Sequence, residues 1–404
     1  MEYLIPIFLC LFLSLRYDES IGQTYLGEYH KNKKLFNFIF LWLVALSALQ
    51  YCVGYDIPIY MDSYKSSSHA NLSDIWGDAR YRPGWLFLQY LCHKISDDFV
   101  ALKIVQAVFL NFCVYKFLSR YSKYWYLTLF FYILYPYGQL NFGAMRQSFA
   151  VGFFLLSVPY LEAQGSKKGT FVALTKYYIL VYLASLFHAS AFVLFLLPLL
   201  KLFVFTSKNL AITIALVILG SFVLSQTSEL RMILYSYIQT NDEIEQNARH
   251  YLTSDAYDIS RNGLALIRAF VPIMFIYLCL YLNRKKHDKR SEVLRILLLA
   301  YLIMATLNLF IPIFYRLNDF FVFSYIVLIP IAIFDGDLFK NPMRLQSPIL
   351  KMAIFFVFIL TPVNHLVAVH PSFGFPGYRI YYPYHSVFDP QIDPDRNRMI
   401  NYNL

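Results

Sequence analysis

Arginines stand at the heads of long apolar stretches in this sequence, where a membrane helix would otherwise hold only apolar side chains. Arg146 lies near the start of "NFGAMRQSFAVGFFLLSVPYL" (141–161), and Arg316 lies in "FYRLNDFF". The guanidinium fork matches phosphate oxygens, and charge-assisted hydrogen bonds are about twice as strong as neutral ones. The pattern predicts an anionic ligand bound by Arg146 and Arg316, with Arg80 and Arg82 as further contacts.

A histidine and an aspartate are the candidates for proton transfer. His188 divides the apolar stretch "LASLFHASAFVLFLLPL" (183–199), and Asp56 follows another apolar stretch in "CVGYDIPIY". A neutral imidazole, with an ordinary pKa near 6.5, can take a proton from a substrate hydroxyl group. We predict His188 as the general base, with Asp56 as its alternative or partner. The competing interpretation is structural: arginines that anchor helices to lipid headgroups, and a histidine satisfied by its own surroundings.

The composition indicates the class of protein that holds these residues. Of 404 residues, 58% are hydrophobic and only 15% are charged, with a mean hydropathy of +0.48; a typical soluble protein has about 25% charged residues. A soluble core cannot bury this much apolar surface. Apolar runs of about 18 residues or more predict an all-α polytopic membrane protein, and the alternating segments of a β-barrel are absent.

We expect one integral membrane domain over residues 1–404, with about 10–12 transmembrane helices, some of them short or re-entrant. The stretch 171–203 would be near 50 Å long as one straight helix. That exceeds a hydrocarbon core of about 30 Å, so a break near His188 is predicted. The expected spans are 3–15, 35–54, 99–118, 124–140, 145–161, 171–187, 189–203, 209–225, 264–282, 292–311, 317–334 and 351–368.

Basic loops predict the orientation of the spans, because loops rich in Lys and Arg face the cytoplasm. Alternation then sends loops 55–98 and 226–263 and the tail 369–404 to the outer side, and all six candidate residues emerge there. The basic loops are 30–34, 119–123, 165–168, 283–290 and 340–344.

No cofactor, metal or nucleic acid is expected. The formal charge of +10 falls mostly in short loops beside apolar runs, as membrane topology predicts, and not in a nucleic-acid-binding patch. The five cysteines form no C-x-x-C pair, and the chain has no Walker loop or dinucleotide fingerprint.

Several of these stretches resemble the EpsG-type polysaccharide polymerases, which belong with the Wzy O-antigen and capsule polymerases. The resemblance runs in order from "YD" at 55–56 to the tyrosine-rich tail. Where such proteins often show an acidic residue before Pro-Gly, this chain has Arg82. The matching stretches are "LNFGAMRQSFAVGFFLL", "LASLFHASAFVLFLLPL", "FYRLNDFF" and "YRIYYPYHSV".

The resemblance implies glycosyl transfer at the outer face of the bacterial cytoplasmic (inner) membrane. A glycan on undecaprenyl pyrophosphate would move onto the non-reducing end of a second lipid-linked repeat unit, without ATP, nucleotide sugar or metal. Arg146 and Arg316 would clamp the diphosphate, with Arg80 or Arg82 as further contacts and His188 or Asp56 as the base. A chain-length regulator protein is a further expected partner.

Other functions compatible with the sequence are a lipid-linked sugar glycosyltransferase, an O-antigen ligase, a flippase or transporter of the lipid-linked unit, and a membrane O-acyltransferase. A flippase typically lines a mid-membrane cavity with charges, whereas the candidate residues here gather at one face. An O-acyltransferase needs polar groups that a cytoplasmic donor can reach.

Overall fold

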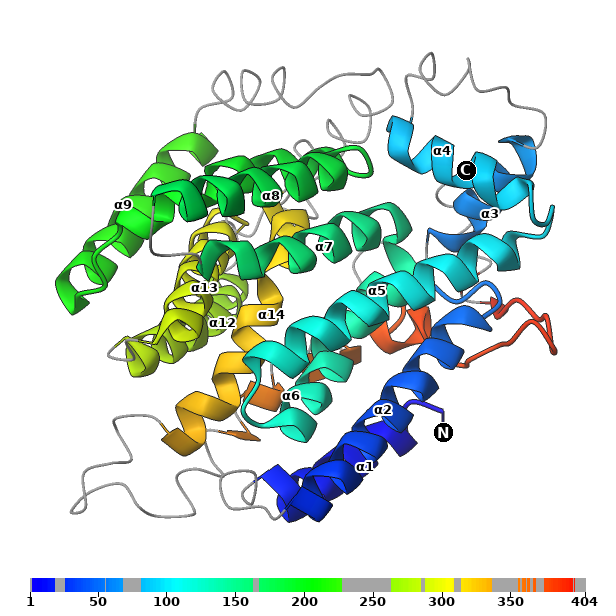
Figure 1. Cartoon of the computed structure of the whole chain (residues 1–404), viewed down its shortest axis with the longest axis horizontal. Coiled ribbons are helices and arrows are strands. Elements are labelled where there is room, and N and C mark those ends of the chain that lie inside the picture. Colours follow the sequence, from blue (N-terminus) through cyan, green and yellow to red (C-terminus); the bar gives the residue numbers. More distant parts are fainter. Residues whose placement is uncertain are drawn as a thin grey trace.

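The computed structural model describes residues 2–18, 26–54, 56–67, 81–162, 167–226, 263–284, 288–308, 314–335, 374–394 and 396, with short pieces between 355 and 367. These residues form a bundle of helices with no β-strand among them (Figure 1). The α-helices are α1 (Leu4–Leu13), α2 (Leu26–Ala48), α3 (Ile57–Ser66), α4 (Pro83–His93), α5 (Phe99–Tyr121), α6 (Trp125–Tyr132), α7 (Met145–Ser157), α8 (Lys167–Ser185), α9 (Ser207–Gln226), α12 (Gly263–Asn283), α13 (Lys289–Asn308) and α14 (Tyr315–Asp335). The remaining helical segments are π-helical, namely η1 (Ser14–Asp18), η5 (Ile133–Tyr137) and η6 (Gln139–Gly143), or 3₁₀-helical, namely η7 (Val158–Glu162), η8 (Ala189–Leu202) and η13 (Gly377–Ile380).

The bundle has the composition of a membrane protein, which confirms the predicted fold class. Among the described residues, α5, α13 and α14 are long and apolar enough to cross a bilayer, and 189–202, 207–220 and 270–283 form shorter apolar helices. α14 is the most buried of the three and packs against α12, α13, α6 and α7. Large apolar side chains are exposed on the peripheral helices, as lipid contact requires; they include Phe171, Leu196, Leu199 and Leu216.

The predicted break near His188 is present. α8 ends at Ser185, His188 has extended backbone (φ −146°, ψ 129°), and η8 begins at Ala189. η8 packs back against α8, with the Tyr177 hydroxyl donating to the Leu194 carbonyl at 2.6 Å. Its 14 residues rise about 2.0 Å each in 3₁₀ form, so this short segment covers about 28 Å.

A second break separates α6 from α7 and determines where α7 begins. The chain is π-helical through η5 and η6, and the Leu140 and Asn141 carbonyls accept hydrogen bonds from side chains of α5. Lys103, which is buried, donates to the Asn141 carbonyl, and Gln106 Nε2 donates to the Leu140 carbonyl at 3.0 Å. Backbone groups released by the break are thereby satisfied inside the bundle, and α7 begins at Met145.

Two of the basic loops, 119–123 and 283–290, meet at one end of the bundle, beside the end of η7. Arg120, at the end of α5, forms a salt bridge with Glu162, at the end of η7 (2.7 Å). Arg290, at the start of α13, donates to the Arg120 carbonyl at 3.2 Å. We call this the basic-loop end. α7 and η7 together run from it to the opposite end of the bundle, where Arg146 lies.

Candidate functional site

The first turns of α7 and α14 lie side by side and carry the two arginines predicted to bind an anion. Arg146 is the second residue of α7, and Arg316 is the second residue of α14. The Gln147 side chain donates a hydrogen bond to the Arg316 carbonyl and so joins the two helix starts. A helix N-terminus carries a partial positive charge and unpaired N–H groups. Two guanidiniums and two helix N-termini, all positively charged, therefore lie close together at this end of the bundle.

Asp56 lies beside these two guanidiniums. It immediately precedes α3, in the connection that follows α2, and the charges of Arg316 and Arg146 act on its carboxylate. Burial raises the pKa of Asp56 to about 6, and the two guanidiniums offset only part of that effect. A carboxyl group with a pKa near 6 is well matched to accept a proton near neutral pH.

Gly54 brings the chain to Asp56. It has φ of +103°, and a Cβ at this position would lie 1.7 Å from the Phe142 carbonyl oxygen. Only glycine combines this backbone conformation with so close an approach. The connection after α2 therefore passes directly against the break before α7, close to where Arg146 stands.

His188 completes the group, but its hydrogen bonds limit what it can do. The Ser190 N–H donates to His188 Nδ1 (3.2 Å), and the Ser190 hydroxyl lies 2.6 Å from the same nitrogen. Because Nδ1 accepts, the proton of the neutral ring is on Nε2. Burial and the charges of Arg316, Arg146 and Arg82 hold the pKa of His188 well below its usual range. His188 is therefore suited to donate a hydrogen bond through Nε2–H and poorly suited to accept a proton.

Arg82 joins the group through the start of α4. The Gly84 N–H donates to the Leu186 carbonyl at 2.9 Å, just before His188, and a Cβ at Gly84 would lie 2.8 Å from that oxygen. The Arg82 guanidinium packs over the Phe192 ring at 5.3 Å. Arg80 lies outside the described residues.

We call Asp56, Arg82, Arg146, His188 and Arg316 the polar cluster. Five of the six candidate residues thus come together from separate parts of the chain, at the end of the bundle opposite the basic-loop end. The Arg146 guanidinium packs over the rings of Tyr81 (4.9 Å) and Tyr60 (5.9 Å). Its Nε is buried and has no hydrogen-bond partner within the described part of the chain. A buried donor of this kind is a reason to expect a bound acceptor.

Two further residues at this site were not predicted as site residues. Asp319 follows Arg316 by three residues on α14, so the two side chains share a face of the helix. Tyr381, from the C-terminal segment, interacts electrostatically with both Asp319 and Asp56. The Arg-x-x-Asp spacing was a usable signal for Asp319. Nothing local in the sequence indicates that the tail returns to this end of the bundle.

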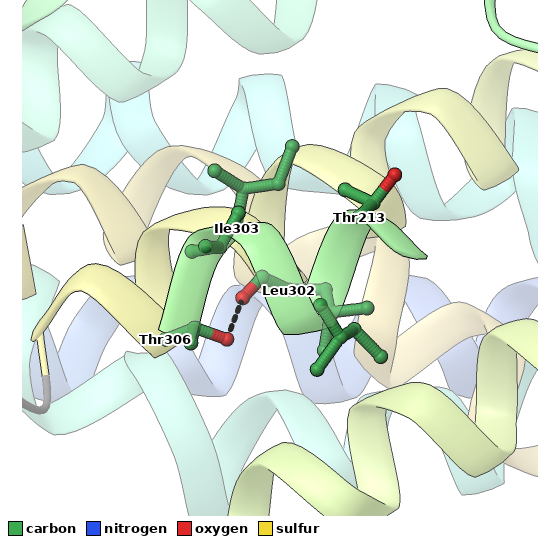
Figure 2. Close-up of a pocket in the computed structure, with 6 residues that line it drawn as sticks. Thr213, Leu302, Ile303 and Thr306 are labelled. Carbon is green, nitrogen blue, oxygen red and sulfur yellow. Dashed lines mark hydrogen bonds between the residues drawn. The ribbon is translucent and has the colours of Figure 1, made fainter. Parts of the chain in front are cut away.

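A small apolar pocket lies elsewhere, between α9 and α13 (Figure 2). The Thr306 hydroxyl donates to the Leu302 carbonyl at 2.7 Å, as the figure shows. No polar-cluster residue lines this pocket. Within the described ranges, no group of three or more His, Cys, Asp or Glu side chains could hold a metal ion.

A family model described as "EpsG family" matches residues 33–386, which is nearly the whole chain. The chain belongs to the EpsG family. No curated protein and no solved structure gives a significant match. The region matched to the EpsG family contains the whole polar cluster, together with Asp319 and Tyr381. Its membership of the EpsG family and its apolar helices identify the chain as a membrane protein of polysaccharide synthesis.

Proposed function

We propose that this EpsG-family protein is a polymerase that joins undecaprenyl-diphosphate-linked saccharide repeat units into O-antigen, capsule or exopolysaccharide chains. The observation that carries the proposal is the pairing of Arg146 and Arg316, each at a helix N-terminus, beside the Asp56 carboxylate. Cations fixed around a carboxylate suit a reaction in which an anionic group leaves and a hydroxyl is deprotonated.

In the proposed reaction, the bond between the donor sugar's anomeric carbon and the diphosphate oxygen breaks, and its electron pair stays on the diphosphate. Arg146 and Arg316 stabilise the charge that develops there, and this lowers the barrier because the charge is larger in the transition state than in the ground state. His188 donates through Nε2–H to the same anion, and Arg82 adds a third guanidinium.

The acceptor hydroxyl oxygen forms the new bond to the anomeric carbon, and its proton passes to Asp56. We assign the base to Asp56 in preference to His188, the base that the sequence predicts. The reason is electrostatic: three guanidiniums act on the imidazole and oppose a positive charge on it, whereas arginines beside Asp56 favour its charged, basic form. Because the diphosphate already activates the sugar, the step balances without nucleotide or metal.

We further propose that the polar cluster faces the periplasm or cell exterior, and that the membrane is the bacterial cytoplasmic (inner) membrane. Support comes from the opposite end, where loops rich in Lys and Arg meet around Arg120, because such loops are retained in the cytoplasm. A lipid-linked donor would enter from the bilayer, which is consistent with arginines at the ends of membrane helices and not in an enclosed soluble cleft.

Deleting the gene and displaying surface polysaccharide on a gel tests the function. A polymerase predicts loss of the long-chain ladder while a single repeat unit remains. Loss of that unit as well would contradict a polymerase and indicate a ligase or a flippase. Reconstituted vesicles then separate these two, since a flippase moves one unit across the bilayer without transferring it to an acceptor.

A further inference from the structure

The C-terminal segment is built into the cluster end of the bundle. Its backbone pairs with the connection that follows α2: the Tyr51 N–H donates to the His385 carbonyl at 2.8 Å, and the Gly54 N–H donates to the Ile380 carbonyl at 3.1 Å. Arg396, only 1% exposed, donates through Nη1 to the Cys52 carbonyl at 2.9 Å. The segment is therefore held over the same connection that carries Asp56.

This attachment fixes the position of Tyr381. The Tyr3 hydroxyl donates to the Tyr381 carbonyl at 3.2 Å, and the Tyr381 ring packs 6.2 Å from the Phe142 ring. An ideal Cβ on Gly138 would lie 3.2 Å from the Tyr381 ring, so a glycine there leaves the ring room to pack. The Tyr381 phenol then lies where both Asp56 and Asp319 act on it electrostatically.

Charge is distributed unevenly across the site. The positive charges of Arg316, Arg146 and Arg82 act on His188, so the side of the site that holds His188 is cationic. The charges of two of these guanidiniums, Arg316 and Arg146, act on Asp56, and the charge of Asp56 acts on Tyr381. Asp56 therefore lies between the cationic side and the C-terminal segment. Beyond it, among the described residues, are Tyr381, on which only the charges of Asp319 and Asp56 act, and Asp319, on which Arg316 is the one guanidinium that acts. Asp319 Oδ2 is buried without a hydrogen-bond partner in the part of the chain that the structure describes.

A buried carboxylate oxygen without a donor costs free energy unless a ligand supplies one. Sugar hydroxyls are donors of the required kind, and the face of a sugar ring packs against an aromatic side chain. An anionic sugar would meet Asp56 and Asp319 together, and like charges at close range repel. The cationic side suits the diphosphate, and the side formed by Asp56, Tyr381 and Asp319 suits a neutral sugar.

We propose that Tyr381 and Asp319 form the subsite for the terminal sugar of the acceptor, and that this sugar is uncharged. The proposal rests on the proposed function, since it assigns the acceptor side of that reaction. In it, Asp319 accepts a hydrogen bond from a sugar hydroxyl, Tyr381 packs against the sugar ring and bonds to it through its phenol, and the hydroxyl that reacts is presented to Asp56.

A two-substrate assay on the purified full-length protein in nanodiscs tests this assignment. The donor is the radiolabelled lipid-linked unit isolated from cells that lack this protein. The acceptor is the same saccharide cut from its lipid diphosphate and converted to a methyl glycoside, which can receive a sugar but cannot donate one. Tyr381→Phe and Asp319→Asn are each expected to raise KM for the acceptor about tenfold or more, with KM for the donor unchanged.

Matched controls are available close by. Tyr382 is 45% exposed, so Tyr382→Phe changes the same functional group in the same segment, and Asp389→Asn removes an exposed carboxylate. Both controls should retain the wild-type KM for the acceptor. An acceptor ending in the corresponding uronic acid should be used poorly by the wild type and relatively better by Asp319→Asn, a gain that a folding defect cannot produce.

The subsite is overturned if Tyr381→Phe and Asp319→Asn raise KM for the donor as much as for the acceptor, or if neither value changes. Equal use of the neutral and uronic acid acceptors by the wild type would refute the claim of an uncharged sugar. Failure of the proposed function looks different: the wild type itself would neither consume the donor nor extend the methyl glycoside.

Discussion

The assignment of the base to Asp56 makes a quantitative prediction about pH. With the pKa of Asp56 raised to about 6 by burial, half of the protein carries the basic carboxylate at that pH. The fraction rises above pH 6 and falls about tenfold per pH unit well below it. The rate of a single turnover should therefore fall on the acid side of pH 6. It is measured with purified protein and saturating lipid-linked substrate.

Asp56→Asn should remove this acid limb and lower the rate by about 10²–10⁴, which is the usual contribution of a general base. His188→Gln should keep the limb near pH 6 and cost no more than about tenfold, because the glutamine amide N–H can still donate a hydrogen bond to the anion. Arg146→Gln should move the limb to higher pH, because the Arg146 charge lowers the pKa of Asp56.

The opposite pattern would refute the reasoning. If His188→Gln abolished the acid limb while Asp56→Asn preserved it, the proton acceptor would be the imidazole. Substrate affinity measured in parallel separates this result from a loss of binding, and the thermal midpoint of each purified variant separates it from misfolding.

Three other predictions concern the arginine fork, the backbone and metals. Arg316→Lys keeps the charge but loses the bidentate geometry, so the turnover rate at matched expression should fall about tenfold or more. Gly54→Ala should sharply lower the thermal midpoint of unfolding, because the new Cβ would overlap the Phe142 carbonyl at a position with positive φ. Gly220→Ala is the control and should leave the midpoint unchanged, because no atom lies within 4 Å of a Cβ there. Equal midpoints for the two variants would contradict this prediction. EDTA should leave polymerisation by the purified protein unchanged, and a loss restored by added Mg²⁺ would argue against a metal-free site.

Much of the arrangement follows from the sequence because the polar residues stand at the ends of apolar runs. Once the basic loops are placed on one side, alternation of the spans sends Arg146, His188 and Arg316 to the other side. The break at His188 follows from length alone, since one straight helix over that stretch would overshoot the bilayer. These inferences need only the period and length of apolar segments.

Other features depend on tertiary contacts that no local pattern encodes. Tyr381 reaches the site because the tail pairs with the connection after α2 and Arg396 is anchored on Cys52. The proposed role of His188 as a hydrogen-bond donor depends on the Ser190 N–H at Nδ1 and on guanidiniums from three separate segments. The electrostatic environment of a residue cannot be read from its own flanking sequence.

The central claim is that guanidiniums from separate helices bind the same lipid diphosphate. Its most direct test is the affinity of the purified protein for undecaprenyl diphosphate, measured for the wild type, Arg146→Gln, Arg316→Gln and a Lys94→Gln control. Lys94 is exposed at the end of α4, over the Tyr90 ring at 4.9 Å. We predict that each arginine variant weakens binding about tenfold or more while the control does not. Wild-type affinity in both arginine variants would contradict the account.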